Sequence, residues 1–166
     1  MKNTMKNLET SQDFKRVRVW AKKRGIITKG NQETQIIKLI EEYGELCGGI
    51  LKKDHELTVD SIGDMIVVLI NLNKICGFDL EHGLKDYKIN TLTDRECLKE
   101  IYVKIGMMFE SPQKTIAIIN QSGHIISLLD TICDNNGLDI STCLAIAYSE
   151  IKNRTGKNVN GNFIKD

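Results

Sequence analysis

The sequence DMIVVLINL, residues 64–72, decides the fold of this chain. From Met65 to Leu72 the stretch is apolar almost without interruption, so a helix built on it is buried on most of its sides. The run is too short to cross a bilayer, which needs roughly twenty apolar residues. A helix enclosed in this way needs other helices around it. We therefore expect this segment at the centre of a helical bundle.

Helical spacing of apolar residues continues through the rest of the chain. One proline and few aromatic residues leave little room for strands. Glycine, asparagine and charged clusters mark the breaks, and Asp79 and Asp139 are placed as N-caps. The tail from Thr155 is rich in Gly, Asn and Lys and is predicted to be a loop or a lid. The predicted helices span residues 9–24, 32–52, 57–76, 79–88, 94–109, 112–135 and 139–153.

Composition points to one cytoplasmic domain. The chain has 166 residues, 41% of them hydrophobic and 27% charged, which suits a single core. A net charge of +1 gives no general reason to expect nucleic-acid or membrane binding, so a small molecule is the expected partner. The five cysteines form no C-x-x-C motif and have no nearby His at ligand spacing, which predicts reduced, buried cysteines. No signal-peptide pattern follows the first lysines.

Two parts of the chain are predicted to be copies of one helical hairpin. A shift of sixty residues lays Gly63 on Gly123, with apolar matches around them and an aspartate cap after each helix. The alternative is that any two amphipathic helices align to some extent. The copies, at about 32–76 and 94–135, together predict an all-α, four-helix-bundle-like core with flanking helices, in one domain over 1–166.

Only the first copy carries acids suited to a hard cation. Glu42, Glu45, Asp60 and Asp64 fall on Lys104, Met107, Asn120 and His124 of the second copy. We interpret the second copy as scaffold and His124 as a satisfied helix histidine.

The glutamates of the helix over 32–52 can be explained either as solvent-exposed helix residues or as metal ligands. Glu42 and Glu45 are three residues apart, hence neighbours on the helix surface. They flank or oppose an apolar stripe, and glutamate is a good exposed helix residue, so alone they indicate a solvated face. The expected stripe is Ile36, Ile40, Tyr43, Cys47 and Ile50.

The next helix changes this interpretation. Asp60, Asp64 and Asn71 lie along one line of it, at spacings of four and seven. An ionised aspartate beside so apolar a segment is costly unless a metal ion or an Arg or Lys compensates it. Mg²⁺ prefers oxygen ligands and is commonly held by a few carboxylates plus substrate phosphates. A di-iron bundle would use Glu-x-x-His pairs, which are absent. The acids therefore leave two alternatives open: a metal ion, for which Mg²⁺ with Mn²⁺ as a substitute fits the ligands, and an Arg or Lys partner.

Three groups of residues together resemble a known family. The first is Gln35-x-x-Lys38-Leu39-x-Glu41-Glu42-x-Gly44-Glu45-Leu46, followed by Asp60-Ser61-Ile62-Gly63-Asp64. The second is the closing segment 147–157, with Asn160-Gly161 after it, and the third is the upstream set Trp20, Arg24-Gly25 and Lys29-Gly30. These motifs resemble the MazG-like all-α nucleoside triphosphate pyrophosphatases, especially the short phage and prophage type. The resemblance covers the first half of the chain and roughly the last thirty residues.

The resemblance implies Mg²⁺-dependent hydrolysis of a nucleoside triphosphate to the monophosphate and pyrophosphate, as in nucleotide-pool house-cleaning. In the family, E-x-x-E and E-x-x-D motifs bind the metal; here Glu42 and Glu45 match the first, and Asp64 matches the aspartate of the second. The glutamate of the second motif falls on Ser61, which leaves the number of metal ions open, with Asp60 as a neighbouring substitute.

Further roles follow from the resemblance and the chemistry. Glu41 or Glu45, if unligated, would accept the proton of the attacking water. The candidate substrate-binding residues are Lys38, Asn71, Lys152, Arg154, Lys157 and Trp20. The C-terminal cations can instead interact with a helix dipole, and Trp20 can instead pack in the core.

Two alternatives and one question of assembly stay open. The alternatives are a relative specific for dUTP or dCTP and a helical interaction protein that has lost activity. Family members usually build their bundle between subunits. The duplication instead predicts a self-contained protomer, with a homodimer as the alternative.

Overall fold

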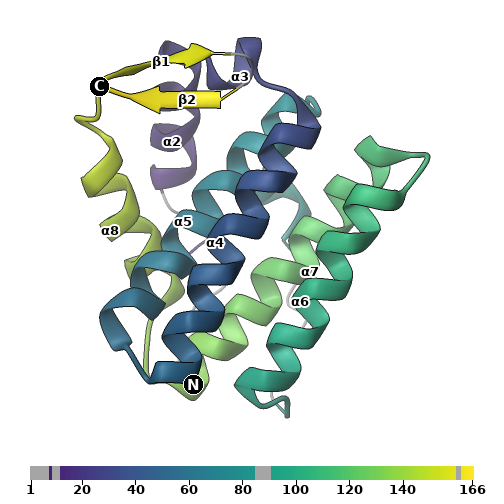
Figure 1. Ribbon diagram of the computed structural model, residues 1–166, viewed down its shortest axis with the longest axis vertical. Coiled ribbons are helices and arrows are strands. Elements are labelled where there is room, and N and C mark those ends of the chain that lie inside the picture. The colour runs from purple at the N-terminus through teal and green to yellow at the C-terminus, as the bar shows by residue number, and fades with distance from the viewer. Residues whose placement is uncertain (1–7, 9–11, 85–90, 160–161) are drawn as a thin grey trace.

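The computed structural model describes residues 8, 12–84, 91–159 and 162–166, and helices dominate it (Figure 1). The elements are α2 (Gln12–Lys23), α3 (Ile26–Lys29), α4 (Gln32–Lys52), α5 (His55–Ile75), a 3₁₀ helix η1 (Leu80–Gly83), α6 (Asp94–Glu110), α7 (Lys114–Asn135), α8 (Ile140–Ile151), β1 (Gly156–Val159) and β2 (Asn162–Lys165). The predicted all-α class is confirmed. The only regular strands in the described ranges form the small hairpin β1–β2.

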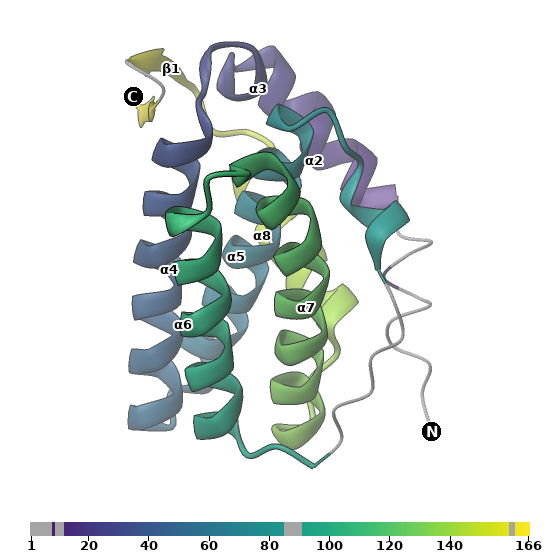
Figure 2. The same ribbon diagram turned by 90° about the vertical axis from the view of Figure 1, so that its right-hand side faces the viewer.

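Helix α5 is the centre of the molecule. It packs against α4, its hairpin partner, and against α2, α7 and α8. Every residue from Met65 to Leu72 is buried, as the apolar run predicts. The second hairpin, α6–α7, stands beside the first, with α6 next to α4 (Figure 2). The four long helices therefore form a bundle whose other side is covered by α8, with α2 lying across one end.

Helix ends follow local capping chemistry. The side chains of Asn31, Asp54 and Asp139 accept hydrogen bonds from backbone N–H groups of α4, α5 and α8, and Thr93 forms a capping box at the start of α6. These interactions satisfy amide groups that the first turn of a helix leaves unpaired.

The predicted helix over 79–88 is wrong where it can be compared with the structure. Only Leu80–Gly83 is helical, as a 3₁₀ turn, and residues 85–90 lie outside the described ranges. Asp79 precedes the turn without capping it, because its carboxylate is bound by Lys74 at 2.7 Å and lies 3.7 Å from Arg18.

Two buried glycines mark close crossings of the chain. A Cβ at Gly63 would lie 2.5 Å from the carbonyl oxygen of Cys143 on α8, closer than van der Waals contact allows. A Cβ at Gly123 would lie 2.9 Å from the carbonyl oxygen of Gly83. The two glycines that the predicted repeat aligns thus both allow another segment of backbone to approach the helix closely. The duplication itself stays a prediction.

The C-terminal tail is a β-hairpin and not the predicted loop. Strands β1 and β2 pair antiparallel, with Gly156 opposite Lys165 and Val159 opposite Asn162. The rings of Phe163 and Trp20 meet edge to face with centroids 5.8 Å apart, which seats the hairpin on α2.

All five cysteines are free, as expected, and Cys97, Cys133 and Cys143 are buried. Helix α7 is long and apolar enough to cross a membrane by length and composition, but 61% of its apolar stretch is buried inside the molecule. That burial is typical of a core helix.

Candidate functional site

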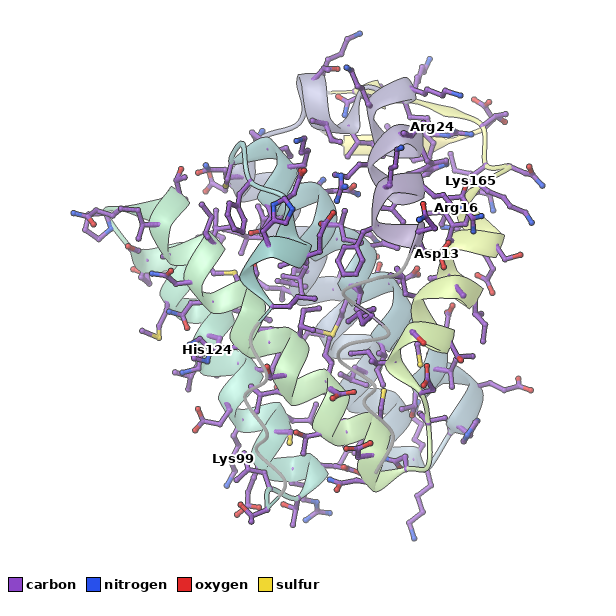
Figure 3. The ribbon with its side chains drawn as sticks, turned by 180° about the vertical axis from the view of Figure 1, so that it is seen from behind. Asp13, Arg16, Arg24, Lys99, His124 and Lys165 are labelled. Atoms are coloured by element: carbon purple, nitrogen blue, oxygen red, sulfur yellow. The ribbon has the colours of Figure 1, made fainter. Side chains whose placement is uncertain are left out.

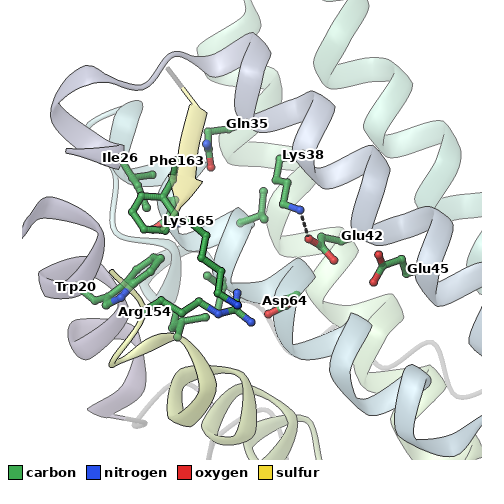
Figure 4. Close-up of a pocket in the computed structure, with 14 residues that line it drawn as sticks. Trp20, Ile26, Gln35, Lys38, Glu42, Glu45, Asp64, Arg154, Phe163 and Lys165 are labelled. Atoms are coloured by element: carbon green, nitrogen blue, oxygen red, sulfur yellow. Dashed lines mark ion pairs between the residues drawn. The ribbon is translucent and has the colours of Figure 1, made fainter. Parts of the chain in front are cut away.

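A cavity of about 340 Å³ opens between α4, α5, the end of α8 and the C-terminal hairpin (Figure 4). Its size falls in the range of pockets for small ligands. The residues that line it are Trp20, Ile26, Gln35, Lys38, Glu42, Glu45, Asp64, Val67, Val68, Asn71, Ile151, Arg154, Phe163 and Lys165. Figure 4 shows two different ends: Trp20, Ile26 and Phe163 gather at one, and the carboxylates of Glu42, Glu45 and Asp64 lie at the other.

Helix α4 turns one face toward this cavity, on which Gln35, Lys38, Glu42 and Glu45 recur at spacings of three and four. Glu42 is only 5% exposed, so it belongs to the buried side of the helix and not to the flanking face expected from the sequence.

The predicted apolar stripe of α4 is wrong in one position. Ile40 is 45% exposed, whereas Leu39 and Leu46 are fully buried. The buried face of α4 is therefore rotated toward Glu42, because α5 packs along the Leu39–Leu46 side.

A short ion pair holds Glu42. Its carboxylate lies 2.6 Å from the ammonium of Lys38, which also lies 2.9 Å from Glu41. Burial raises the pKa of Glu42, and the ion pair with Lys38 offsets only part of this effect. Burial alone would lower the pKa of Lys38, but its hydrogen bonds to the two glutamates raise it.

Asp64 carries the strongest electrostatic signal of the site. Burial, reinforced by the charges of Glu42 and Asp60, raises the pKa of Asp64 to about 7, although the positive charge of Arg154 acts in the opposite direction. No ion-pair partner contacts Asp64 among the described residues. The acidic end of the cavity therefore lacks a protein cation close enough to keep Asp64 ionised.

Asn71 lies two turns further along α5, on the same side as Asp64, and also lines the cavity. It is 3% exposed, and its Oδ1 has no hydrogen-bond partner among the described residues. A buried amide oxygen without a partner is costly unless a ligand or water satisfies it. Asn71 therefore offers a hydrogen-bonding position to a molecule in the cavity.

Cations lie between the two ends. Lys38 reaches in from α4, Arg154 follows α8, and Lys165 ends β2. In Figure 4 the charged groups of Arg154 and Lys165 approach one another beside Asp64. Arg154 lies 3.7 Å from the carboxylate of Glu150 on α8.

Four candidate residues lie outside this cavity. Glu41 is exposed and paired with Lys38, and Lys152 and Lys157 are exposed. Asp60 lines a separate cavity near the α4–α5 turn, where its Oδ1 is buried without a hydrogen-bond partner in the described ranges.

The structure also places Ser61 and His124, the two residues that stand where the sequence comparison would put an acid. Ser61 is fully buried, and its hydroxyl donates to the carbonyl oxygen of Leu57 at 2.6 Å. It does not line the cavity. His124 lines another cavity in the second hairpin and lies well away from Arg24 and Lys165 when the molecule is seen from behind (Figure 3).

Sequence reasoning missed Gln35, Ile26, Phe163 and Lys165 as cavity residues. A signal for two of them existed. Asn160-Gly161 is a dipeptide typical of two-residue hairpin turns, and the residues on either side can alternate as strands do. That pattern would have put Phe163 and Lys165 on one face of a strand.

The acidic residues of the cavity have the oxygen ligands that a hard cation prefers, but their carboxylates are too far apart to form a closed metal site. Glu42, Glu45 and Asp64 offer only oxygen donors, which Mg²⁺ prefers, and the raised pKa of Asp64 indicates uncompensated charge. Within the described ranges, however, no three His, Cys, Asp or Glu side chains are grouped closely enough to hold one ion. Glu42 is paired with Lys38 instead.

The fold and the cavity define an all-α protein with a pocket lined by aromatic, cationic and acidic side chains. The chain is 39% identical over 66 residues to an uncharacterized 18.2 kDa protein of the rep-hol intergenic region of Haemophilus phage HP1. That similarity covers 40% of this chain and 40% of the phage protein, so the chain spans less than half of this relative. No family model and no solved structure matches the chain.

Proposed function

We propose that this protein is a Mg²⁺-dependent nucleoside triphosphate pyrophosphohydrolase that converts a (deoxy)nucleoside triphosphate to the monophosphate and pyrophosphate. The observation that carries the proposal is the arrangement of side chains along the cavity in Figure 4: an aromatic and aliphatic end, then cations, then carboxylates at the far end. A nucleotide has the same order of chemistry, with a flat base, then phosphates, then the metal that accompanies them.

Glu42, Glu45 and Asp64 are the residues that would hold Mg²⁺, not as one closed set of three ligands but together with substrate phosphates and water. The ion would neutralise phosphate charge and lower the pKa of a bound water. Asp60 is a weaker candidate ligand, since it lines another cavity.

The cationic side chains would position the substrate. Phosphoryl transfer depends mainly on placement and on stabilisation of charge at the phosphate oxygens. Lys38 and Arg154 line the cavity between its two ends and can donate to such oxygens. Asn71 supplies an unsatisfied amide for a further hydrogen bond.

Glu45 is the best-placed proton acceptor when its carboxylate is not bound to Mg²⁺. It lines the cavity, is exposed, and has no ion-pair partner among the described residues, so its carboxylate is free to take a proton from water. Glu41, the other sequence candidate, faces solvent and is paired with Lys38.

The phage relative supports a phage or prophage setting, and a nucleotide-pool enzyme would act in the cytoplasm, where its substrates are. The printed name of that relative gives no activity.

One observation favours a second candidate function, a helical interaction protein without activity. Ser61, at the position where the resemblance expects a glutamate, is buried and bonded to its own helix, so the second acidic motif is incomplete.

A panel assay separates the two functions. The protein is incubated with the four common ribonucleoside triphosphates and with dATP, dGTP, dCTP, dTTP and dUTP, first with Mg²⁺ and then with EDTA, and pyrophosphate is measured. The proposal expects release from at least one nucleotide in Mg²⁺ and none in EDTA. Absence of metal-dependent release from every nucleotide would contradict it and favour the interaction protein. Preference for dUTP or dCTP would identify the narrower enzyme.

A further inference from the structure

The C-terminal hairpin contributes two side chains to the cavity that no acidic motif includes. Strand pairing sets Asn158 opposite Phe163 and Lys157 opposite Ile164. Because side chains alternate along a strand, Phe163 and Lys165 share one face and Ile164 takes the other. The structure agrees with this alternation: Phe163 and Lys165 line the cavity, whereas Ile164 is 50% exposed.

The hairpin contacts α2, and the segment that leads into it contacts Arg24, the residue that follows α2. Arg24 donates from Nε to the carbonyl oxygen of Arg154 at 2.7 Å, and its guanidinium lies 5.1 Å from the centre of the Trp20 ring. Phe163 meets the same tryptophan edge to face. These contacts place the hairpin over the cavity as a fixed wall.

Gly156 makes room for the ring of Phe163. A Cβ at Gly156 would lie 2.7 Å from that ring and 2.3 Å from the carbonyl oxygen of Ile164. The position of Phe163 at the apolar end of the cavity is therefore built into the pairing of the two strands.

Lys165 brings a second positive charge to Arg154. Both side chains reach the same part of the cavity (Figure 4), and Lys165 has no ion-pair partner among the described residues. Two neighbouring cations repel each other unless an anion lies between them. Their arrangement is typical of a position prepared for phosphate oxygens.

We propose that the C-terminal hairpin is the substrate-recognition wall of the pocket: Phe163 forms, with Trp20, the surface that contacts the nucleobase, and Lys165 forms, with Arg154, the position that binds the polyphosphate. This inference rests on the proposed nucleotide substrate and assigns its two ends to named residues of one β-strand. It makes the hairpin a determinant of affinity and not of the chemical step.

Two pairs of variants test the assignment. Lys165→Gln is compared with Lys23→Gln, which removes an exposed charge from the end of α2, and Phe163→Ala is compared with Ile164→Ala, which truncates the outward side chain next to it. For each, kcat and KM are measured with the nucleotide that the wild-type protein hydrolyses fastest in Mg²⁺. The inhibition constant of inorganic tripolyphosphate, which has no base, is measured in the same assay.

The two hairpin variants should weaken binding of different parts of the nucleotide, Lys165→Gln that of the polyphosphate and Phe163→Ala that of the base. Lys165→Gln should raise KM and the tripolyphosphate inhibition constant together, by roughly tenfold or more, with kcat changed less than threefold, as expected for loss of one charge-assisted contact. Phe163→Ala should raise KM to a similar degree and leave the tripolyphosphate inhibition constant within about twofold, because that ligand does not reach the apolar end. Both control variants should match the wild type.

Other results would overturn the assignment. If Lys165→Gln behaves like Lys23→Gln, or if Phe163→Ala weakens tripolyphosphate and nucleotide equally, the hairpin is a structural support only, while the proposed enzyme stands. A wild-type protein that neither hydrolyses any nucleotide nor changes the fluorescence of Trp20, the single tryptophan, when nucleotides are added would overturn both proposals. Should Phe163→Ala fail to fold, Phe163→Leu keeps an apolar side chain, and the same separation is expected of it.

Discussion

Glu42 and Asp64 lie on neighbouring helices at the same end of the cavity, but their surroundings differ. Glu42 has a cationic partner in Lys38 at 2.6 Å. Asp64 has only the more distant charge of Arg154, and the pKa of its carboxyl rises to about 7. Of the two acids, Asp64 therefore depends more on a cation from solution.

This difference predicts how the stability of the metal-free protein depends on pH. The pKa of Asp64 is about 7 in the folded protein and about 4 in an unfolded chain, so the folded state holds the proton more tightly. The free energy of unfolding in EDTA should then fall as pH rises from about 4 to 7, by at most about 4 kcal/mol from this group.

Asp64→Asn should remove most of that dependence and raise Tm at pH 8, and Glu33→Gln, an exposed change on α4, should keep the wild-type pH profile. Thermal unfolding at a series of pH values measures both. Equal pH profiles for Asp64→Asn and wild type would show that burial does not raise the pKa of Asp64.

The proton acceptor can be tested by a pair of glutamates on one helix. Glu45→Gln should lower kcat by about 10² or more, as loss of a general base does, because Glu45 lines the cavity. Glu41→Gln should lower it less than threefold, because Glu41 faces solvent. A reversed order in steady-state assays would assign the base to Glu41.

Much of the site could be predicted from single residues and their spacing. Asp64 and Asn71 share a line of an apolar helix, and both line the cavity. The position of Asp60 could not be read in the same way, because it lies in the second turn of α5, where a different cavity opens between the start of α5 and α8. Lys165 could not be found by helical spacing, since its place depends on strand pairing with β1.

At the scale of elements, close helix packing sets the position of α8 and hence of Arg154. Gly63 lets α8 approach α5, with Cys143 and Ala147 against the place where a side chain would begin. Gly106, on α6, has no neighbour within 4 Å of an added Cβ.

Gly63→Ala should destabilise the protein by about 1–3 kcal/mol, the usual cost of overpacking a core. Gly106→Ala should stabilise it by about 0.5–1 kcal/mol, since alanine favours an exposed helix more than glycine does. Chemical denaturation measures both changes in the free energy of unfolding. A neutral Gly63→Ala would mean that α5 and α8 are not in close contact.

The long helices were predictable and the short elements were not. α4 begins and ends at the predicted residues, and α5 and α7 begin within two residues of prediction, because apolar periodicity over many turns gives a strong signal. The segment after Asp79 also has apolar residues at helical spacing, but the Asp79 carboxylate contacts Lys74 and Arg18 and does not cap a helix. Such contacts join residues that periodicity does not relate.

At the scale of the whole molecule, the hairpin α6–α7 packs beside α4–α5 within the same chain. The lining side chains of the cavity belong to α2, α3, α4, α5, the end of α8, the residue Arg154 that follows it, and β2. Because the second hairpin supplies the remaining helices of the bundle, we predict a self-contained protomer whose turnover stays constant over several orders of magnitude of protein concentration. Activity assays with light scattering in parallel test this. Loss of specific activity on dilution would show that a second copy completes the site.

The most direct test of the central claim is Mg²⁺-dependent pyrophosphate release by the wild type, Asp64→Asn and Glu33→Gln, all confirmed as folded by circular dichroism. Asp64→Asn should lose at least about 10² in kcat, since a carboxylate at the metal-binding end is removed, while Glu33→Gln should retain wild-type turnover. Wild-type turnover by Asp64→Asn would contradict the claim that the carboxylates of this cavity are the active site.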